Sequence, residues 1–201
     1  MKLYFTPGAC SLSPHIALIE TGLEYELIQV DLRTKQTASG DNYLAICPKG
    51  YIPALQLDNG QMLTEGAIVI QYLADQVPEK ELVPRQGSFE RYRLQEKLHF
   101  LATELHKAMS PLYNPKASDE FKDSLKERLK LRLSVLAEDL GQQEFLAGNR
   151  FTVADGYAFY CLRAWQKHGQ SDLATWPNLA AYFARLEARP SVKRALAEEG
   201  L

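Results

Sequence analysis

The sequence predicts an α/β domain followed by an all-helical domain. Strand-forming and helix-forming segments alternate up to about residue 77, whereas the later segments carry apolar residues at helical spacing. Between them, Val77–Gln86 combines two prolines with alternating charges, a composition typical of a linker. We therefore predict an α/β domain at residues 1–78, a linker at 79–87 and an all-helical domain at 88–201.

The first domain is expected to open with a strand, a turn and a helix. Lys2–Thr6 is predicted to form a short strand, and Pro7-Gly8-Ala9 a turn after it. Ser11 can cap the next helix, and Gly22 can end it. Pro14 then falls in the first turn of that helix, where its missing N–H costs little.

A second strand, a hairpin and a second helix follow. Tyr25–Leu32 is rich in strand-forming residues, whereas residues 33–50 are polar and predicted to be irregular. Asn59-Gly60 separates two short apolar runs, which predicts a β-hairpin. Thr64 is predicted to cap a helix with apolar side chains at helical spacing. These side chains are Ile68, Val69, Tyr72 and Leu73.

The second domain is expected to contain only helices. Phe89–Met109 forms one long helical stretch, and Ser118 can cap a further helix that Gly141 ends. Thr152–Asp155 resembles a capping box that opens another helix. Two prolines mark the start of the next helix and the break before the last segment. These lie in Trp176-Pro177 and Arg189-Pro190.

Composition excludes several classes of function. The 23 basic and 25 acidic residues give a net charge of −2 without a basic block, so neither nucleic acid nor an anionic membrane is an expected partner. No apolar run approaches the roughly 18 residues that cross a bilayer, and the first residues lack a signal-peptide pattern, so we expect a cytoplasmic protein. Cys10, Cys47 and Cys161 form no CxxC pair, so neither a disulfide scaffold nor a metal site is expected.

Cys10 is the first residue that suggests chemistry. It lies between a predicted turn and a predicted helix start, where free N–H groups and the helix dipole favour a thiolate. Because Cys10 belongs to a CxxS sequence, a reactive Cys10 would need a disulfide partner from elsewhere, such as a small thiol. The alternative is an inert cysteine that fills a contact between helix and sheet.

Two further segments extend this hypothesis. Ile52-Pro53 at a strand entrance could be a cis bond that turns backbone groups toward a peptide-like ligand. Thr64-Glu65-Gly66 at a helix start offers N–H donors to a carboxylate, and Glu65 could receive an ammonium group. For Thr64 alone, simple helix capping is the favoured role. Together the segments suit an amino-acid-like ligand.

Several motifs resemble those of beta-class bacterial glutathione transferases. They are PGACS around Cys10, PKGxIP ending at Pro53, LTEGAIVIQYLAD from Leu63, TELHK from Thr103, and LAGxxFTxAD ending at Asp155. The resemblance covers essentially the whole chain. It implies a thioredoxin-like first domain with an all-helical second domain, the glutathione transferase fold, and a homodimer that uses glutathione as co-substrate and no metal.

The resemblance also implies roles for individual residues. The sulfur of glutathione would lie at the catalytic residues Cys10 and His106, with Lys107 as a nearby positive charge. The rest of glutathione would contact Ile52, a cis Pro53, Glu65, Gly66 and Lys35. Polar side chains at His99, Thr103 and Glu104 would complete the site, some reaching across from the other subunit. A small electrophile would bind along the all-helical domain.

This chain departs from the family pattern at two positions. Many relatives carry tyrosine at position 5, whereas this chain has Phe5, so no phenol at that position can contact the sulfur. Position 99 is commonly asparagine, and here it is His99, which introduces a titratable ring. His15 and His168 have no such context and are predicted to be structural.

Three functions follow as hypotheses. The first is conjugation, in which the glutathione thiolate attacks a small electrophile, with halogenated and aromatic molecules as the candidate classes. The second is thiol–disulfide exchange or peroxide reduction through Cys10. The third is a non-enzymatic binding protein that keeps only the fold. Cys10 together with TELHK argues against the third, because a scaffold needs neither.

Overall fold

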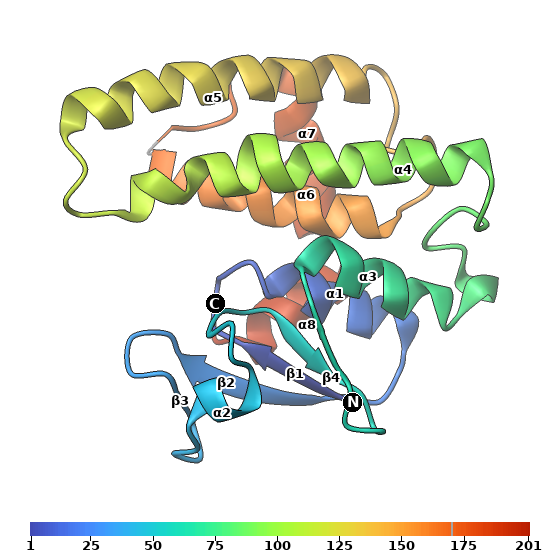
Figure 1. Cartoon of the computed structure of the whole chain (residues 1–201). Helices are drawn as coiled ribbons and strands as arrows, with labels where there is room; N and C mark the ends of the chain where they lie inside the picture. The colour runs from blue at the N-terminus through green and yellow to red at the C-terminus, as the bar shows by residue number, and fades with distance from the viewer. Residues whose placement is uncertain (170) are drawn as a thin grey trace. The chain divides into compact units, whose positions relative to one another are not determined.

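The computed structural model describes residues 1–169 and 171–201 and separates into two compact units. The first unit contains Met1–Val83 together with Arg189–Leu201, and the second contains Pro84–Ala188 (Figure 1). The predicted domains placed all of 88–201 in the helical part. The division by contacts differs there, because the last helix packs on the first unit.

The described part of the first unit holds a five-stranded mixed sheet in the order β3-β2-β1-β4-β5. The central strand β1 pairs in parallel with β2 and antiparallel with β4, and β5 pairs antiparallel with β4. The strands are β1 (Lys2–Phe5), β2 (Glu26–Asp31), β3 (Gln36–Thr37), β4 (Ala54–Gln56) and β5 (Met62–Thr64).

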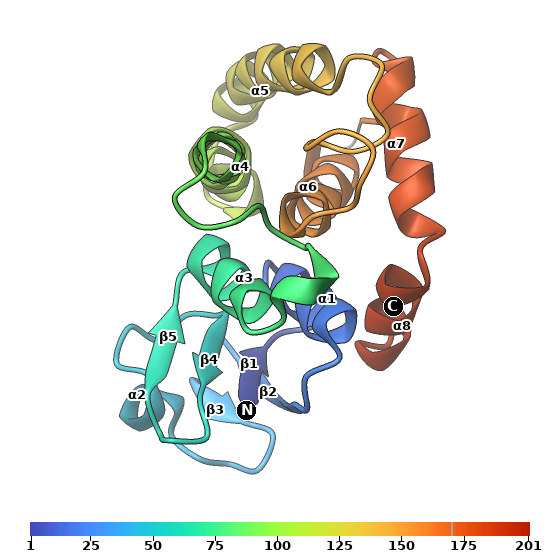
Figure 2. The same cartoon turned by 90° about the vertical axis from the view of Figure 1, so that its right-hand side faces the viewer.

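Both faces of β1 are covered. Leu3, Tyr4 and Phe5 are all buried, although their side chains alternate between the two faces. Tyr4 packs against Tyr43 of α2 (Tyr43–Ile46), with ring centroids 5.4 Å apart. Phe5 faces His15 of α1 (Leu12–Thr21), with centroids 6.4 Å apart. In Figure 2, α1 lies beside α3 (Gly66–Asp75) on one side of the sheet.

The predicted hairpin and the first helix are present, but their details correct two predictions. Ser11 precedes α1, yet its hydroxyl bonds to the backbone of Thr6 rather than capping the helix. Thr64 is the last residue of β5, and Glu65 occupies the cap position of α3 without a side-chain cap bond. The predicted irregular segment 33–50 contains β3 and α2, which are too short for a pattern to reveal.

The last helix, α8 (Pro190–Glu198), is fixed to α1 by a buried polar cluster. His15 is fully buried, with Nε2 2.8 Å from a Glu198 oxygen and Nδ1 3.0 Å from a Glu199 oxygen. Arg189 pairs with Glu20 through two hydrogen bonds. His15 is therefore a satisfied structural histidine, as predicted, and it explains why the chain end belongs to the first unit.

Among the described residues of the second unit, the named elements are all helices, and an isolated β-bridge joins Phe145 to Gly148. The predicted long helix 89–109 divides into α4 (Phe89–Phe100) and a π-helical segment, η2 (Leu101–Lys107). The apolar stripes predicted for both long helices are buried. The other segments are η3 (Ser110–Tyr113), α5 (Asp119–Leu140), α6 (Val153–Ala164), η4 (Trp165–Gly169) and α7 (Pro177–Glu187); the short η1 (Pro78–Lys80) belongs to the first unit.

Helix α6 begins at the predicted capping box. Asp155 is fully buried, and its carboxylate accepts hydrogen bonds from the backbone and hydroxyl of Thr152, from the Leu146 amide and from the Tyr182 phenol. Burial raises the pKa of Asp155, and these hydrogen bonds partly offset that effect. Nearly all of α6 is buried, so this cap fixes the central helix of the unit.

Replacing Asp155 should destabilise the protein strongly. We expect Asp155→Ala to lower the free energy of unfolding by about 3 kcal/mol, because it leaves several buried donors without an acceptor. Asp123→Ala is a matched control, since Asp123 is exposed and pairs with Lys126 along α5; its effect should stay below about 0.5 kcal/mol. Urea unfolding followed by circular dichroism measures both, and equal effects would contradict the role of the cap.

Candidate functional site

Cys10 lies in the turn between β1 and α1, one residue before the Ser11 cap position. The thiol is half-buried and donates to the Ile52 carbonyl oxygen at 3.4 Å. It packs against a buried cluster that includes Tyr4, Tyr43 and Cys47. The structure therefore brings together two segments that the sequence placed far apart, the Cys10 turn and Ile52-Pro53.

The acidity of Cys10 differs from the prediction. Burial raises the pKa of the thiol to about 12, and the amides of Cys10 and Ser11 offset only part of this effect. The nearby carboxylate of Glu65 raises the pKa further. The helix start does supply the expected N–H groups, but desolvation outweighs them. Cys10 is thus a thiol, not a thiolate, at neutral pH.

Ile52-Pro53 adjoins both Cys10 and the start of α3. The peptide bond between Ile52 and Pro53 is cis, as predicted, and both residues are buried. Ile52 lies just outside the β1–β4 ladder, whose pairing on this side ends at Ala54. A Cβ atom added to Gly66 would lie 3.6 Å from Pro53 Cγ, so the first residue of α3 packs directly on this proline.

Glu65 projects from this junction into solvent. Its φ of 70° lies in the left-handed region, which is uncommon for a residue with a side chain. Its carbonyl accepts the first hydrogen bonds of α3, from Ile68 and Val69. An exposed carboxylate therefore stands beside the N–H groups at the start of α3, where a ligand with both ammonium and carboxylate groups would fit.

Lys35 lies on the same unit beside Gly50. Its φ is 58°, and its ammonium group donates to the Gly50 carbonyl at 2.5 Å. Gly50 precedes Ile52 by two residues, so Lys35 supplies positive charge next to the Ile52-Pro53 segment. Lys49 donates to the Thr64 hydroxyl at 2.7 Å and ties the same loop to β5.

The remaining predicted residues belong to the second unit, on α4 and η2. His99 and Thr103 are exposed, and each bonds to the helix backbone: His99 Nδ1 lies 3.0 Å from the Gln95 carbonyl, and Thr103 donates to the His99 carbonyl. Glu104 forms an ion pair with Arg132 of α5 at 2.6 Å. Arg132 was not identified from the sequence, because nothing there indicates that α5 faces Glu104.

His106 is half-buried in η2, where the π-helical turns widen the helix at the predicted site residues. Its Nδ1 lies 2.8 Å from the Tyr157 hydroxyl of α6. Burial lowers the pKa of His106 to about 4, and the adjacent Lys107 contributes to the shift. The imidazole is therefore neutral at neutral pH. Tyr157 was also missed by sequence reasoning.

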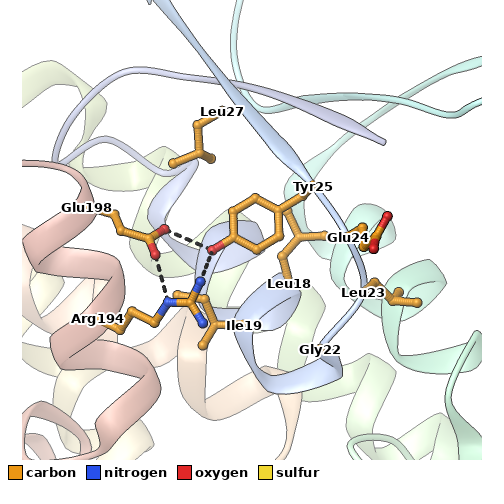
Figure 3. Close-up of a pocket in the computed structure, with 9 residues that line it drawn as sticks. All are labelled: Leu18, Ile19, Gly22, Leu23, Glu24, Tyr25, Leu27, Arg194 and Glu198. Carbon is orange, nitrogen blue, oxygen red and sulfur yellow. Dashed lines mark hydrogen bonds and ion pairs between the residues drawn. The ribbon is translucent and has the colours of Figure 1, made fainter.

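Apart from the predicted site residues, a cleft with a volume of about 770 Å³ lies on the first unit beside α8. Figure 3 shows Tyr25, Arg194 and Glu198 hydrogen-bonded to one another along its wall. Burial and the bond to Glu198 raise the pKa of Tyr25 to about 12, whereas Glu198 has a pKa of about 2 because the bonds from Arg194, His15 and Tyr25 outweigh its burial. None of the predicted site residues lines this cleft.

Among the described residues, no group of His, Cys, Asp and Glu side chains is arranged to hold a metal ion. In the same part of the chain, every helix is too short or too polar to cross a membrane.

Comparisons with known proteins identify the family. The profile of the glutathione S-transferase N-terminal domain matches residues 8–76, and that of the C-terminal domain matches residues 100–190. The chain is 43% identical to the glutathione S-transferase GstA of Escherichia coli O157:H7 over the full length of both proteins. The chain therefore belongs to the glutathione S-transferase family.

Two solved structures agree with this assignment over their whole lengths. A sphingomonad glutathione S-transferase complexed with glutathione has a TM-score of 0.95 and 45% identity, with both chains covered fully. The bacterial beta-class glutathione S-transferase of Sphingomonas chungbukensis has a TM-score of 0.95 and 47% identity, again with full coverage. The predicted beta-class resemblance and the predicted fold are thus confirmed.

The raised pKa of Cys10 predicts slow alkylation. Because the group is protonated below its folded-state pKa, the thiolate fraction should rise about tenfold for each pH unit between pH 7 and 10, without levelling near 8.5. Iodoacetamide labelling followed by peptide mass spectrometry measures the rate at Cys10, and a urea-unfolded sample gives the reference. A plateau below pH 8 in the folded protein would contradict the raised pKa.

Proposed function

We propose that this chain conjugates the thiolate of glutathione to a small electrophile. The observation that carries the proposal is the junction in the first unit at which the Cys10 turn, the cis Ile52-Pro53 bond and the start of α3 meet. Membership in the family and the glutathione complex of the sphingomonad relative support the same ligand. The identity of the electrophile is not part of the proposal.

The ligand would lie along this junction as an extended tripeptide. The α-carboxylate of its γ-glutamyl end would accept from N–H groups at the start of α3, at Gly66, and its ammonium group would face Glu65. Its cysteinyl backbone would pair with Ile52 before Pro53, in the manner of an added strand. Its glycyl carboxylate would face the ammonium group of Lys35.

The chemistry of the sulfur follows from the state of Cys10. A protonated Cys10 can donate a hydrogen bond to the glutathione thiolate, in place of its bond to the Ile52 carbonyl. His106 would contribute a second polar contact to the sulfur, with Lys107 as a nearby positive charge. Once the glutathione thiol has released its proton to solvent water, its sulfur attacks the electrophilic carbon, and the leaving group departs with the electron pair of the bond that breaks.

Exchange through Cys10, the second hypothesis, receives less support. Attack on a disulfide or peroxide requires a thiolate, and a thiol with a pKa of about 12 is almost fully protonated at pH 7. Position 13 holds serine, so a resolving cysteine is missing from the CxxS motif. These two observations favour conjugation.

We also propose that the protein works as a homodimer. On the second unit, Phe89 and Tyr92 of α4 and Leu131 of α5 are each more than 60% exposed. A largely apolar groove of about 300 Å³ lies between these helices and is lined in part by Phe100, Val135 and Leu136. Exposed large apolar side chains and an apolar groove on the same pair of helices are typical of a subunit interface. His99, Thr103 and Glu104 would then reach toward glutathione held by the partner.

The test of conjugation is consumption of glutathione with an aryl halide. We expect turnover above the uncatalysed rate, and Glu65→Gln should raise the KM for glutathione about tenfold, because an ammonium group loses its ionic partner. Glu79→Gln, an exposed carboxylate on η1, is the matched control and should leave KM unchanged. Absence of turnover with a panel of electrophiles would remove the conjugation hypothesis.

The dimer is tested by light scattering on a sizing column. We expect a mass of twice the 22.7 kDa chain. Val135→Glu should shift the protein toward the monomer, because it buries an unpaired charge in the interface. Val135→Leu keeps the apolar surface and serves as the control. A monomer in the wild type, at all concentrations from micromolar upward, would contradict the assembly.

A further inference from the structure

The imidazole of His106 is fixed by two tyrosines of α6. Tyr157 is only 4% exposed and lies in the first part of that helix, with its hydroxyl oxygen 2.8 Å from Nδ1 of His106. Tyr160 follows three residues later, which places it on the same face of the helix. All three side chains belong to the second unit.

Ring packing sets the orientation of the imidazole. The rings of Tyr157 and Tyr160 are stacked, with centroids 6.5 Å apart and an interplanar angle of 23°. His106 meets both rings edge-on, at interplanar angles of 78° and 84° and centroid distances of 5.8 and 5.0 Å. Such edge-to-face contacts restrict rotation of the ring, so the direction in which Nε2 points is fixed by α6.

We propose that Tyr157 is a positioning residue that sets the tautomer of His106: its phenol donates to Nδ1, so that the proton of the neutral imidazole resides on Nε2. This inference rests on the proposed function, in which His106 contacts the sulfur of glutathione. Its consequence is that Nε2 carries the N–H donor that His106 would offer to that sulfur in the proposed function. In this proposal Tyr157 acts through His106 alone and not through a contact of its own with glutathione or the electrophile.

The chemistry of a thiolate explains why this tautomer matters. A neutral imidazole has one donor and one acceptor nitrogen. The burial of His106 keeps it neutral at working pH, so it cannot donate from both nitrogens. A thiolate needs a donor, and the Nε2–H tautomer provides it, whereas the Nδ1–H tautomer would direct a lone pair at the negative sulfur. No proton leaves His106 or Tyr157 in this step; the bond weakens as the sulfur loses its charge to the new carbon–sulfur bond.

A double-mutant cycle separates positioning from packing. We expect Tyr157→Phe, which keeps the ring, to lower kcat for conjugation about fivefold to tenfold with little change in the KM for glutathione. In a His106→Ala background the same substitution should change kcat by less than about twofold, because Tyr157 then has no imidazole to orient. Tyr160→Phe is the matched control. It keeps the edge contact with His106, and kcat should stay within about twofold of wild type.

Nitrogen NMR on histidine-labelled protein gives a readout independent of activity. The His106 signals, assigned from their loss in His106→Ala, should show a protonated Nε2 in the wild type and a mixture of tautomers in Tyr157→Phe. Circular dichroism and thermal melts establish that each variant is folded. An Nδ1–H tautomer in the wild type would overturn the proposal, as would an equal loss of kcat from Tyr157→Phe with and without His106.

The same variants distinguish a failure of the role proposed for His106 from a failure of the positioning role of Tyr157. If His106→Ala leaves conjugation unchanged, the role of His106 in the proposed function is wrong, and the orientation of its ring has no catalytic consequence. If His106→Ala lowers kcat and Tyr157→Phe does not, the proposed function stands and the positioning role of Tyr157 is wrong.

Discussion

The buried carboxylate of Asp155 accepts hydrogen bonds from three other residues, and α6 begins where those donors converge. A carboxylate withdrawn from water is tolerated only when its lone pairs are occupied, so this cap fixes both the start of α6 and the loop before it. The position of the first turn of α6 therefore determines which α6 side chains face η2. The geometry around His106 is thus a consequence of helix capping two residues before Tyr157.

The need to satisfy polar groups away from water also distinguishes the buried His15 from the half-buried His106. In His15, both ring nitrogens face carboxylates, so the ring has no capacity left for a ligand. In His106, the hydrogen bond recorded within the described residues involves Nδ1 alone. Cys10 is intermediate: its thiol donates to a single carbonyl, which a stronger acceptor could replace. Of these three groups, the two that keep hydrogen-bonding capacity, His106 and Cys10, are proposed for the site, whereas the saturated His15 holds the fold.

Local patterns predicted most of the fold, because hairpins, caps and helical stripes are encoded within a few residues. The Asn59-Gly60 turn, the Thr152–Asp155 box and the leucine stripe of α5 are examples. The predictions that failed, and the features that were missed, depend on residues that are distant in the sequence. The sequence indicates that Cys10 meets helix amides, but not how deeply the thiol is buried, and burial decides its pKa. Nothing in the sequence around Tyr157 indicates its contact with η2. The place of α8 depends on the bond between His15 and Glu198, which are 183 residues apart.

The return of the chain end to the first unit has a consequence for biosynthesis. Glu199 accepts a hydrogen bond from the Gly8 amide at 2.8 Å, and 191 positions of the sequence separate the two residues, so Gly8 is synthesised well before its partner. Until Glu198 and Glu199 have left the ribosome, His15 lacks both of its carboxylates, and the face of α1 that α8 covers stays exposed to water. The first unit can thus form its sheet early, but its packing is complete only once α8 has been made.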